Sequence, residues 1–191
     1  VSDFVAAFSG SHRHVIDYLA DEVLARQPAD IRDFLRQTAI LDRLTAPLCH
    51  AVTGRDDSES LLRQLEQANL FLVSLDDQRS WYRYHRLFAD FLRTELDAES
   101  QAALHLKASR WFAAHDLWPE AVKHALAGGD MEEAARVIAL AAGQAFHEAS
   151  FSTLSGWLDV LPDELVRANA ELATFKGFLL FLTGESGRAT A

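Results

Sequence analysis

Apolar residues recur every three or four positions over most of the chain, a period typical of helices that bury one face. In the first 70 residues this pattern predicts helices at residues 12–26, 29–41 and 60–70. Pro28 separates the first two helices, and a polar loop at residues 54–58 precedes the third. This part of the chain is therefore predicted to be helical, with short breaks.

A different pattern occupies residues 70–84. The partly β-branched run LFLVSL and the alternating run WYRY predict two short strands, and DDQRS between them predicts a turn. Helices followed by such a hairpin are typical of a winged helix, in which the hairpin is the wing. The amphipathic run LFADFLRTEL, residues 87–96, then predicts a helix that leaves the hairpin.

After Asp97 every pattern is helical. Short breaks separate five amphipathic segments, at residues 102–115, 119–126, 131–142, 153–161 and 171–182. The start of the third segment is the clearest. Asp130 followed three residues later by Glu133 is typical of a capping box, in which both side chains hydrogen-bond to the first turn.

The helical segments also show a weak repeat. DLWPEA at residues 116–121 returns as GESGRA at residues 184–189, an offset of 68 residues and twice the roughly 34-residue tetratricopeptide period. Gly143 and Gly177 then fall where that repeat needs small residues for close helix packing. We therefore predict a mainly α protein: a winged-helix domain with one β-hairpin, followed by a tetratricopeptide-like α-superhelix.

The charge argues against a nucleic-acid or membrane partner. The formal net charge is −10, and it is evenly spread: residues 1–98 hold 16 acidic and 11 basic residues, and residues 99–191 hold 12 and 7. An acidic surface without a basic cluster repels phosphate backbones and anionic lipids. We therefore expect no direct binding of nucleic acid or membrane by this chain.

No catalytic or metal motif is present in the sequence. The eight histidines are scattered without metal-ligand spacing, and no nucleophile elbow, Walker loop or dinucleotide-binding glycine run occurs. The single cysteine, Cys49, is expected to be a small core residue, and it fits the reducing cytoplasm without proving that location. We expect neither catalytic nor metal-ligating residues, and therefore no enzyme.

Several segments together resemble one family. The large ATP-dependent LuxR-type regulators related to MalT are similar in their central part to FSGSHRHVIDYLADEVLARQP, FLRQTAILDRLTAPLCHAVTG, LLRQLEQANLFLVSLDD and WYRYHRLFADFLR. EAVKHALAGGDMEEAARVI and WLDVLPDELV also resemble the helical-repeat sensor of that family. The resemblance covers essentially all of the chain, and its most specific part is the block that runs from ANLFLV through WYRYH to LFADFLR.

The resemblance implies a domain layout. Residues 1–27 would end the helical domain that follows an ATPase core, residues 28–97 would be the winged-helix domain, and residues 98–191 would begin the tetratricopeptide-like sensor. The family's members are signal-transducing ATPases with numerous domains. The chain would thus be a piece of a longer protein, without the nucleotide-binding domain and the C-terminal helix-turn-helix domain.

The resemblance also implies a function. The chain would be the regulatory segment of a bacterial, cytoplasmic transcriptional activator that couples nucleotide state and inducer binding to self-association. Its partners would be the nucleotide-binding and helix-turn-helix domains of the same protein. ATP or ADP would be bound by the longer protein, and this chain would hold no cofactor of its own. A repeat scaffold that binds a peptide or protein, without a nucleotide switch, remains the alternative.

One residue carries a site prediction. In related nucleotide-switch ATPases a histidine that precedes an amphipathic helix of the winged helix contacts the β-phosphate of ADP, and His85 stands at the matching place. An imidazole N–H at a helix start adds a donor where backbone amides already favour an anion. The alternative is a capping or interface histidine that only orients the wing. Arg83 and Arg86 are expected to be solvated; the alternative is that they assist with phosphate or with interdomain acids.

Overall fold

The computed structural model describes residues 19–182 of the 191-residue chain, with side chains from residue 22 onward. Contacts divide the chain into two compact units, one ending at Leu104 and the other starting at His105. The start of the predicted helix 12–26 and the repeat copy at residues 184–189 lie outside the described residues. The domain boundaries expected from the resemblance stay predictions.

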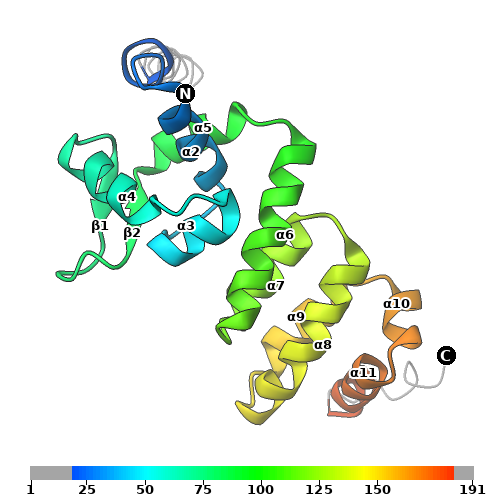
Figure 1. The fold of residues 1–191 in the computed structure, drawn as a ribbon. Coiled ribbons are helices and arrows are strands. Elements are labelled where there is room, and N and C mark those ends of the chain that lie inside the picture. Colours follow the sequence, from blue (N-terminus) through cyan, green and yellow to red (C-terminus); the bar gives the residue numbers. More distant parts are fainter. Residues whose placement is uncertain (1–18, 183–191) are drawn as a thin grey trace, which may run out of the picture. The chain divides into compact units, whose positions relative to one another are not determined.

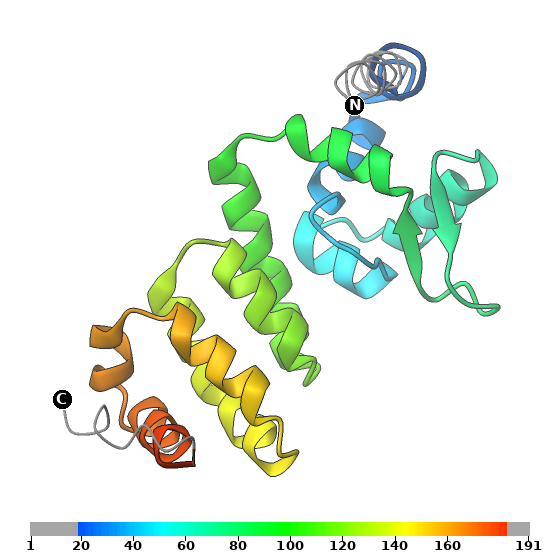
Figure 2. The same cartoon turned by 180° about the vertical axis from the view of Figure 1, so that it is seen from behind.

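The first unit is a small helical domain with a β-hairpin (Figures 1 and 2). In chain order it contains a π-helical turn (Leu19–Leu24), α2 (Ala29–Thr38), α3 (Ala46–Thr53), α4 (Ser58–Gln67), β1 (Leu72–Ser74), β2 (Tyr82–Tyr84), α5 (Arg86–Thr94) and the start of α6 (Ala98–Ala114). Its largest fully buried side chains are Phe34, Leu35, Leu41, Leu44, Leu48, Leu62, Leu65, Phe88 and Leu92. These apolar faces form one core, as the amphipathic periods predict.

The two-stranded sheet is extended by an isolated β-bridge that the sequence pattern does not reveal. β1 and β2 pair antiparallel, with Val73 opposite Arg83. On the other edge of β2, Leu44 N donates to Tyr82 O at 2.8 Å and Tyr82 N donates to Leu44 O at 2.9 Å. The strand β2 is therefore central, and the segment between α2 and α3 is tied to the hairpin.

Two residues between α4 and β1 adopt the left-handed backbone conformation. The φ angle is 50° at Asn69 and 54° at Phe71. Asn69 follows the end of α4, where the Leu70 amide donates to Leu65 O at 3.0 Å, and a left-handed residue is usual at such a helix end. Phe71 ends no helix, and this conformation costs an L-residue about 1–2 kcal/mol.

The second unit consists of consecutive packed helices. They are the rest of α6, α7 (Trp118–Ala127), α8 (Met131–His147), α9 (Phe151–Val160), α10 (Asp163–Ala168) and α11 (Ala170–Leu182). Helix α7 packs on α8, α8 packs on α9, and α11 contacts both α8 and α9. Hydrogen bonds join α6 to α7, among them one of 2.8 Å from Ser109 Oγ to Ala121 O. Serial helix packing agrees with the predicted repeats, whose tetratricopeptide-like character stays a prediction.

Close helix packing occurs at a different glycine from those expected. A Cβ added at Gly143 or Gly177 meets no atom of another described segment within 4 Å. At Gly128 the same Cβ would lie 2.7 Å from the side chain of Leu106 on α6. Among the described glycines, the missing Cβ therefore matters where α7 ends beside α6.

The predicted helix start before α8 is half confirmed. Asp130 Oδ1 accepts a hydrogen bond from Glu133 N at 3.0 Å, as an N-cap residue does. Glu133 does not complete a capping box, because its carboxylate accepts hydrogen bonds from Arg136 Nε at 2.7 Å and Arg136 Nη2 at 2.9 Å. The Arg136 hydrogen bonds hold the pKa of the Glu133 carboxyl below its ordinary value, against the opposing effect of burial.

The predicted fold class, mainly α with one hairpin in a winged-helix domain, is confirmed. Between residues 19 and 182, no helix combines the length and apolar composition that crossing a membrane requires. The structure therefore adds no membrane-spanning helix to the predicted architecture.

Candidate functional site

His85 lies at the junction between the hairpin and α5, and its backbone belongs to both. The His85 amide donates to Phe71 O at 2.7 Å, which extends the β1–β2 ladder by one residue. The His85 carbonyl accepts from Phe88 N at 2.9 Å and from Ala89 N at 3.0 Å, which closes the first turn of α5. No loop separates sheet from helix, so the position of His85 is set by both elements.

The imidazole of His85 projects from this fixed backbone to the surface. His85 is exposed and is the N-cap residue of α5, but its side chain makes no capping hydrogen bond. Its ring contacts the Phe71 ring edge to face, with centroids 6.4 Å apart and planes at 64°. The first backbone N–H groups of a helix lack intrahelical partners and attract anions. An anion at the start of α5 would therefore meet backbone amides and the imidazole together.

The residue before His85 is anchored in the core. The Tyr84 hydroxyl lies 2.8 Å from Thr38 Oγ1, which in turn donates to Phe34 O at 2.7 Å. Both Tyr84 and Thr38 are buried. Burial, with a smaller contribution from nearby Cys49, raises the pKa of the Tyr84 phenol far above its ordinary value, so the phenol stays protonated. This anchor fixes the end of β2, and therefore the backbone that leads into His85.

The two neighbouring arginines are exposed. Arg83 faces outward from β2, opposite Val73, and makes no ion pair within the described part of the chain. The Arg86 side chain is 93% exposed, with Asp90 Oδ2 3.8 Å from its Nε. Most other arginines of the first unit pair more closely with acids. Arg83 and Arg86 are therefore cations beside His85 that remain largely accessible to a partner.

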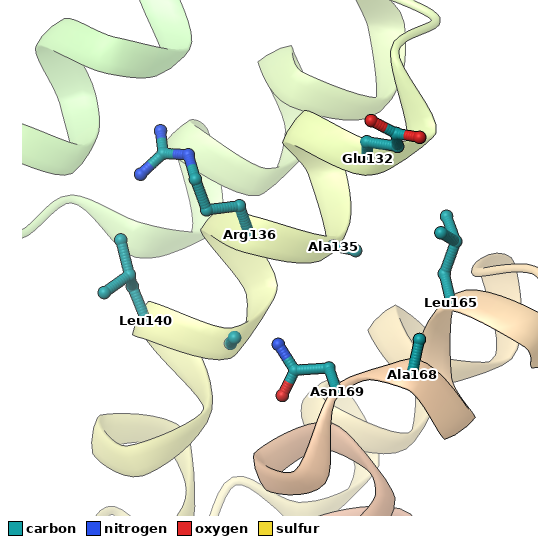
Figure 3. Close-up of a pocket in the computed structure, with 8 residues that line it drawn as sticks. Glu132, Ala135, Arg136, Leu140, Leu165, Ala168 and Asn169 are labelled. Carbon is teal, nitrogen blue, oxygen red and sulfur yellow. The ribbon is translucent and has the colours of Figure 1, made fainter.

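The second unit contains an open pocket of about 370 Å³ between α8 and α10 (Figure 3). Its lining residues are Glu132, Ala135, Arg136, Ala139, Leu140, Leu165, Ala168 and Asn169. Asn169 Oδ1 caps α11 by accepting from Glu171 N and Leu172 N, and Figure 3 shows the amide nitrogen on the side that faces α8. The lining is thus mainly apolar, and its polar members are Glu132, Arg136 and Asn169.

The structure brings together two histidines that the sequence does not pair. His105 Nδ1 and His124 Nδ1 lie 2.8 Å apart, between α6 and α7, and His124 is buried and stacked on Phe112. A separation of 19 residues carries no motif, which explains why the sequence does not reveal the pair. No group of three or more His, Cys, Asp or Glu residues is placed to hold a metal ion within the described ranges.

Cys49 is a core residue, as expected from the sequence. It is fully buried, and burial raises the pKa of its thiol from 9.0 to about 12. The adjacent His50 turns away: its Nδ1 lies 3.1 Å from Arg55 O and 3.3 Å from Asp56 Oδ1. His50 is therefore not placed to activate the thiol as a nucleophile.

Comparison with known proteins identifies the first unit. Residues 20–104 match the family described as the MalT winged helix domain. The first unit is thus MalT-like. The MalT-like similarity extends further, since the chain is 36% identical over 171 residues to the HTH-type transcriptional regulator MalT of Yersinia pestis (strain Pestoides F). It is 34% identical over 170 residues to MalT of Cronobacter sakazakii (strain ATCC BAA-894).

The MalT-like similarity covers most of this chain but little of the relatives. Each alignment includes 87% of the chain, and the chain spans 19% of the length of each relative. The His85 site lies inside the winged helix match, whereas the α8–α10 pocket lies beyond residue 104. The family match therefore includes the His85 site and does not include the α8–α10 pocket.

Proposed function

We propose that this chain is a regulatory segment of a bacterial, ATP-dependent transcriptional activator of the LuxR type. The observation that carries the proposal is the MalT winged helix domain at residues 20–104, supported by similarity to MalT beyond that range. In the longer protein the segment would couple nucleotide state and inducer binding to self-association in the cytoplasm. Its partners would be the nucleotide-binding domain and the helix-turn-helix domain of the same protein.

The winged helix would be a switching element rather than a reader of DNA. In winged-helix and helix-turn-helix readers, a recognition helix enters the major groove and needs free donors and positive charge. Helix α4, which precedes the hairpin, exposes one acid and one base, Glu59 and Arg63, and these two pair with each other. The acidic net charge of −10 supports the same conclusion.

His85 would report the nucleotide state. We infer that its imidazole donates to the β-phosphate of ADP held by the nucleotide-binding domain, and that exchange of ADP for ATP breaks this contact. The neutral imidazole and the imidazolium both carry an N–H donor, so the contact does not require protonation. Loss of one contact would free the winged helix and shift a two-state equilibrium.

The test is an alanine substitution in the longer protein that contains this chain. His85→Ala should weaken ADP affinity about ten- to a hundredfold, because a hydrogen bond to a charged group contributes about 1.5–3 kcal/mol. ATP affinity should change much less. His50→Ala is the matched control, since His50 is an exposed helix histidine of the same unit. Unchanged ADP affinity in His85→Ala, measured by calorimetry, would show that this histidine makes no such contact.

The α8–α10 pocket favours a second function, peptide binding by the helical repeats. A pocket of about 370 Å³ with an apolar lining accommodates one aliphatic side chain, and the Asn169 amide is placed to donate to a peptide carbonyl. Under this hypothesis Ala139→Trp, which fills the pocket, would abolish peptide capture from a display library by the chain. His85→Ala would leave that capture intact, which separates the two functions.

A further inference from the structure

Phe71 has a backbone conformation that its position in the fold does not explain. Five described non-glycine residues have positive φ: Asn69, Phe71, Arg79, Asp116 and Ala149. Three of them follow helix ends, where left-handed residues are usual, and Arg79 lies in the hairpin turn. Phe71 lies in neither setting and carries an aromatic side chain, for which this conformation is a genuine outlier. Such outliers persist where the surrounding structure enforces them and often mark functional positions.

Phe71 meets His85 through both its backbone and its side chain. The Phe71 carbonyl accepts the His85 amide at 2.7 Å, which is the last hydrogen bond of the hairpin before α5. The Phe71 ring packs on the buried ring of Phe88, with centroids 5.3 Å apart. It also contacts the imidazole of His85, and the centroids of these two rings are 6.4 Å apart. Phe71 therefore fixes the backbone of His85 through its carbonyl and contacts its side chain through its ring.

The imidazole has little else to orient it. It forms no hydrogen bond within the described part of the chain, and His85 is exposed. An exposed side chain without a hydrogen bond samples several rotamers and must be ordered when it binds a ligand. Contact with a ring that is itself held by the core reduces this freedom before binding.

We propose that Phe71 is a positioning residue for His85. Its left-handed backbone places its carbonyl and its ring so that the imidazole stays ready at the start of α5. The inference rests on the proposed phosphate contact of His85, and it adds to that site a second residue, which lies directly before β1.

The variants separate the ring from the backbone. Phe71→Gly accepts the left-handed conformation without strain and keeps the carbonyl, but removes the ring. Phe71→Tyr keeps the ring. Asn69→Gly is the matched control, because it relaxes a left-handed residue two positions away, and that conformation is explained by the end of α4. Phe71→Leu replaces the glycine variant if the latter loses the fold, since it keeps an apolar side chain over Phe88.

The measurement is the affinity of the longer protein for ADP and for ATP, by calorimetry. Phe71→Gly should weaken ADP binding about two- to tenfold, the range expected when one side chain must be ordered on binding. ATP binding should be unchanged, because the proposed contact exists only with ADP, whereas a general packing defect would weaken both. Phe71→Tyr and Asn69→Gly should bind ADP as the unmodified protein does.

A double variant tests whether Phe71 acts through His85. If it does, Phe71→Gly should cause no further loss of ADP affinity in a His85→Ala background. If Phe71→Gly lowers ADP affinity equally in both backgrounds, the inference is overturned. It is also overturned if Phe71→Gly leaves ADP affinity unchanged while His85→Ala lowers it. In both cases the phosphate contact of His85 stands. Unchanged ADP affinity in His85→Ala overturns the contact and the inference together.

Discussion

The buried pair of hydroxyls beneath the hairpin allows a sharp prediction about stability. Thr38 Oγ1 has one hydrogen, and it goes to Phe34 O at 2.7 Å, so the Tyr84 hydroxyl must be the donor in the 2.8 Å bond between the two side chains. The two substitutions that remove this bond are therefore unequal. Tyr84→Phe leaves the Thr38 hydroxyl with its own acceptor, whereas Thr38→Val leaves the phenol O–H buried without one.

The magnitudes follow from that asymmetry. Loss of one buried hydrogen bond with its remaining partner still satisfied costs about 1 kcal/mol, which is the expectation for Tyr84→Phe. An unsatisfied buried donor costs about 1–3 kcal/mol, so Thr38→Val should destabilise the first unit more than Tyr84→Phe does. The double variant has neither hydroxyl and should cost less than the sum of the two single substitutions, by about 1 kcal/mol.

Native-state hydrogen exchange suits this measurement. The chain has two compact units, so a single unfolding transition for the whole chain does not isolate the first unit. Opening free energies of the amides in α2 and β2 report on the first unit alone. If the two substitutions add within about 0.5 kcal/mol, or if Tyr84→Phe costs more than Thr38→Val, the assignment of donor and acceptor is wrong.

Three further predictions concern other positions. Burial raises the pKa of Cys49 from 9.0 to about 12, so the folded thiol should resist maleimide at pH 8. The first unit should also lose stability as pH rises from about 9 towards 12, because the thiol ionises in the unfolded chain first. Rapid labelling without unfolding would contradict this prediction. Gly54→Ala should lower the opening free energy of the α3 amides by about 1 kcal/mol, because φ is 77° there, whereas Gly54→Asn should cost less; equal losses would point to a steric cause. Asp130→Ala should cost about 1 kcal/mol through loss of the hydrogen bond to Glu133 N, and Asp130→Ser should restore most of it; an unchanged exchange rate of the α8 amides in the alanine variant would refute the cap.

Sequence patterns predicted the elements that have a period and missed those that have none. The alternation of WYRY and the breakers of DDQRS locate the hairpin because each covers several residues. The β-bridge at Leu44 is a single residue without any alternation to detect. It is recognised only by its two hydrogen bonds to Tyr82. The helix α3 was also not singled out, because APLCHAVT is short and apolar on most sides.

The candidate site was only partly predictable for a related reason. His85 was singled out through the resemblance, which matches a histidine placed directly before an amphipathic run. Phe71 contacts it from 14 residues away, and nothing in the sequence marks a phenylalanine with positive φ. The pair His105 and His124 likewise depends on how α6 and α7 pack.

The shared backbone of His85 sets a constraint on chain length. The sheet ladder ends at its N–H and the helix begins at its carbonyl, so the connection between β2 and α5 contains no spare residue. One residue added or removed there would turn α5 by about 100° about its axis and carry Phe88 and Leu92 out of the core. The turn at residues 76–80 has no such constraint, since it lies at the tip of the hairpin. We therefore expect changes of length to be tolerated at the tip and to unfold the first unit at the junction.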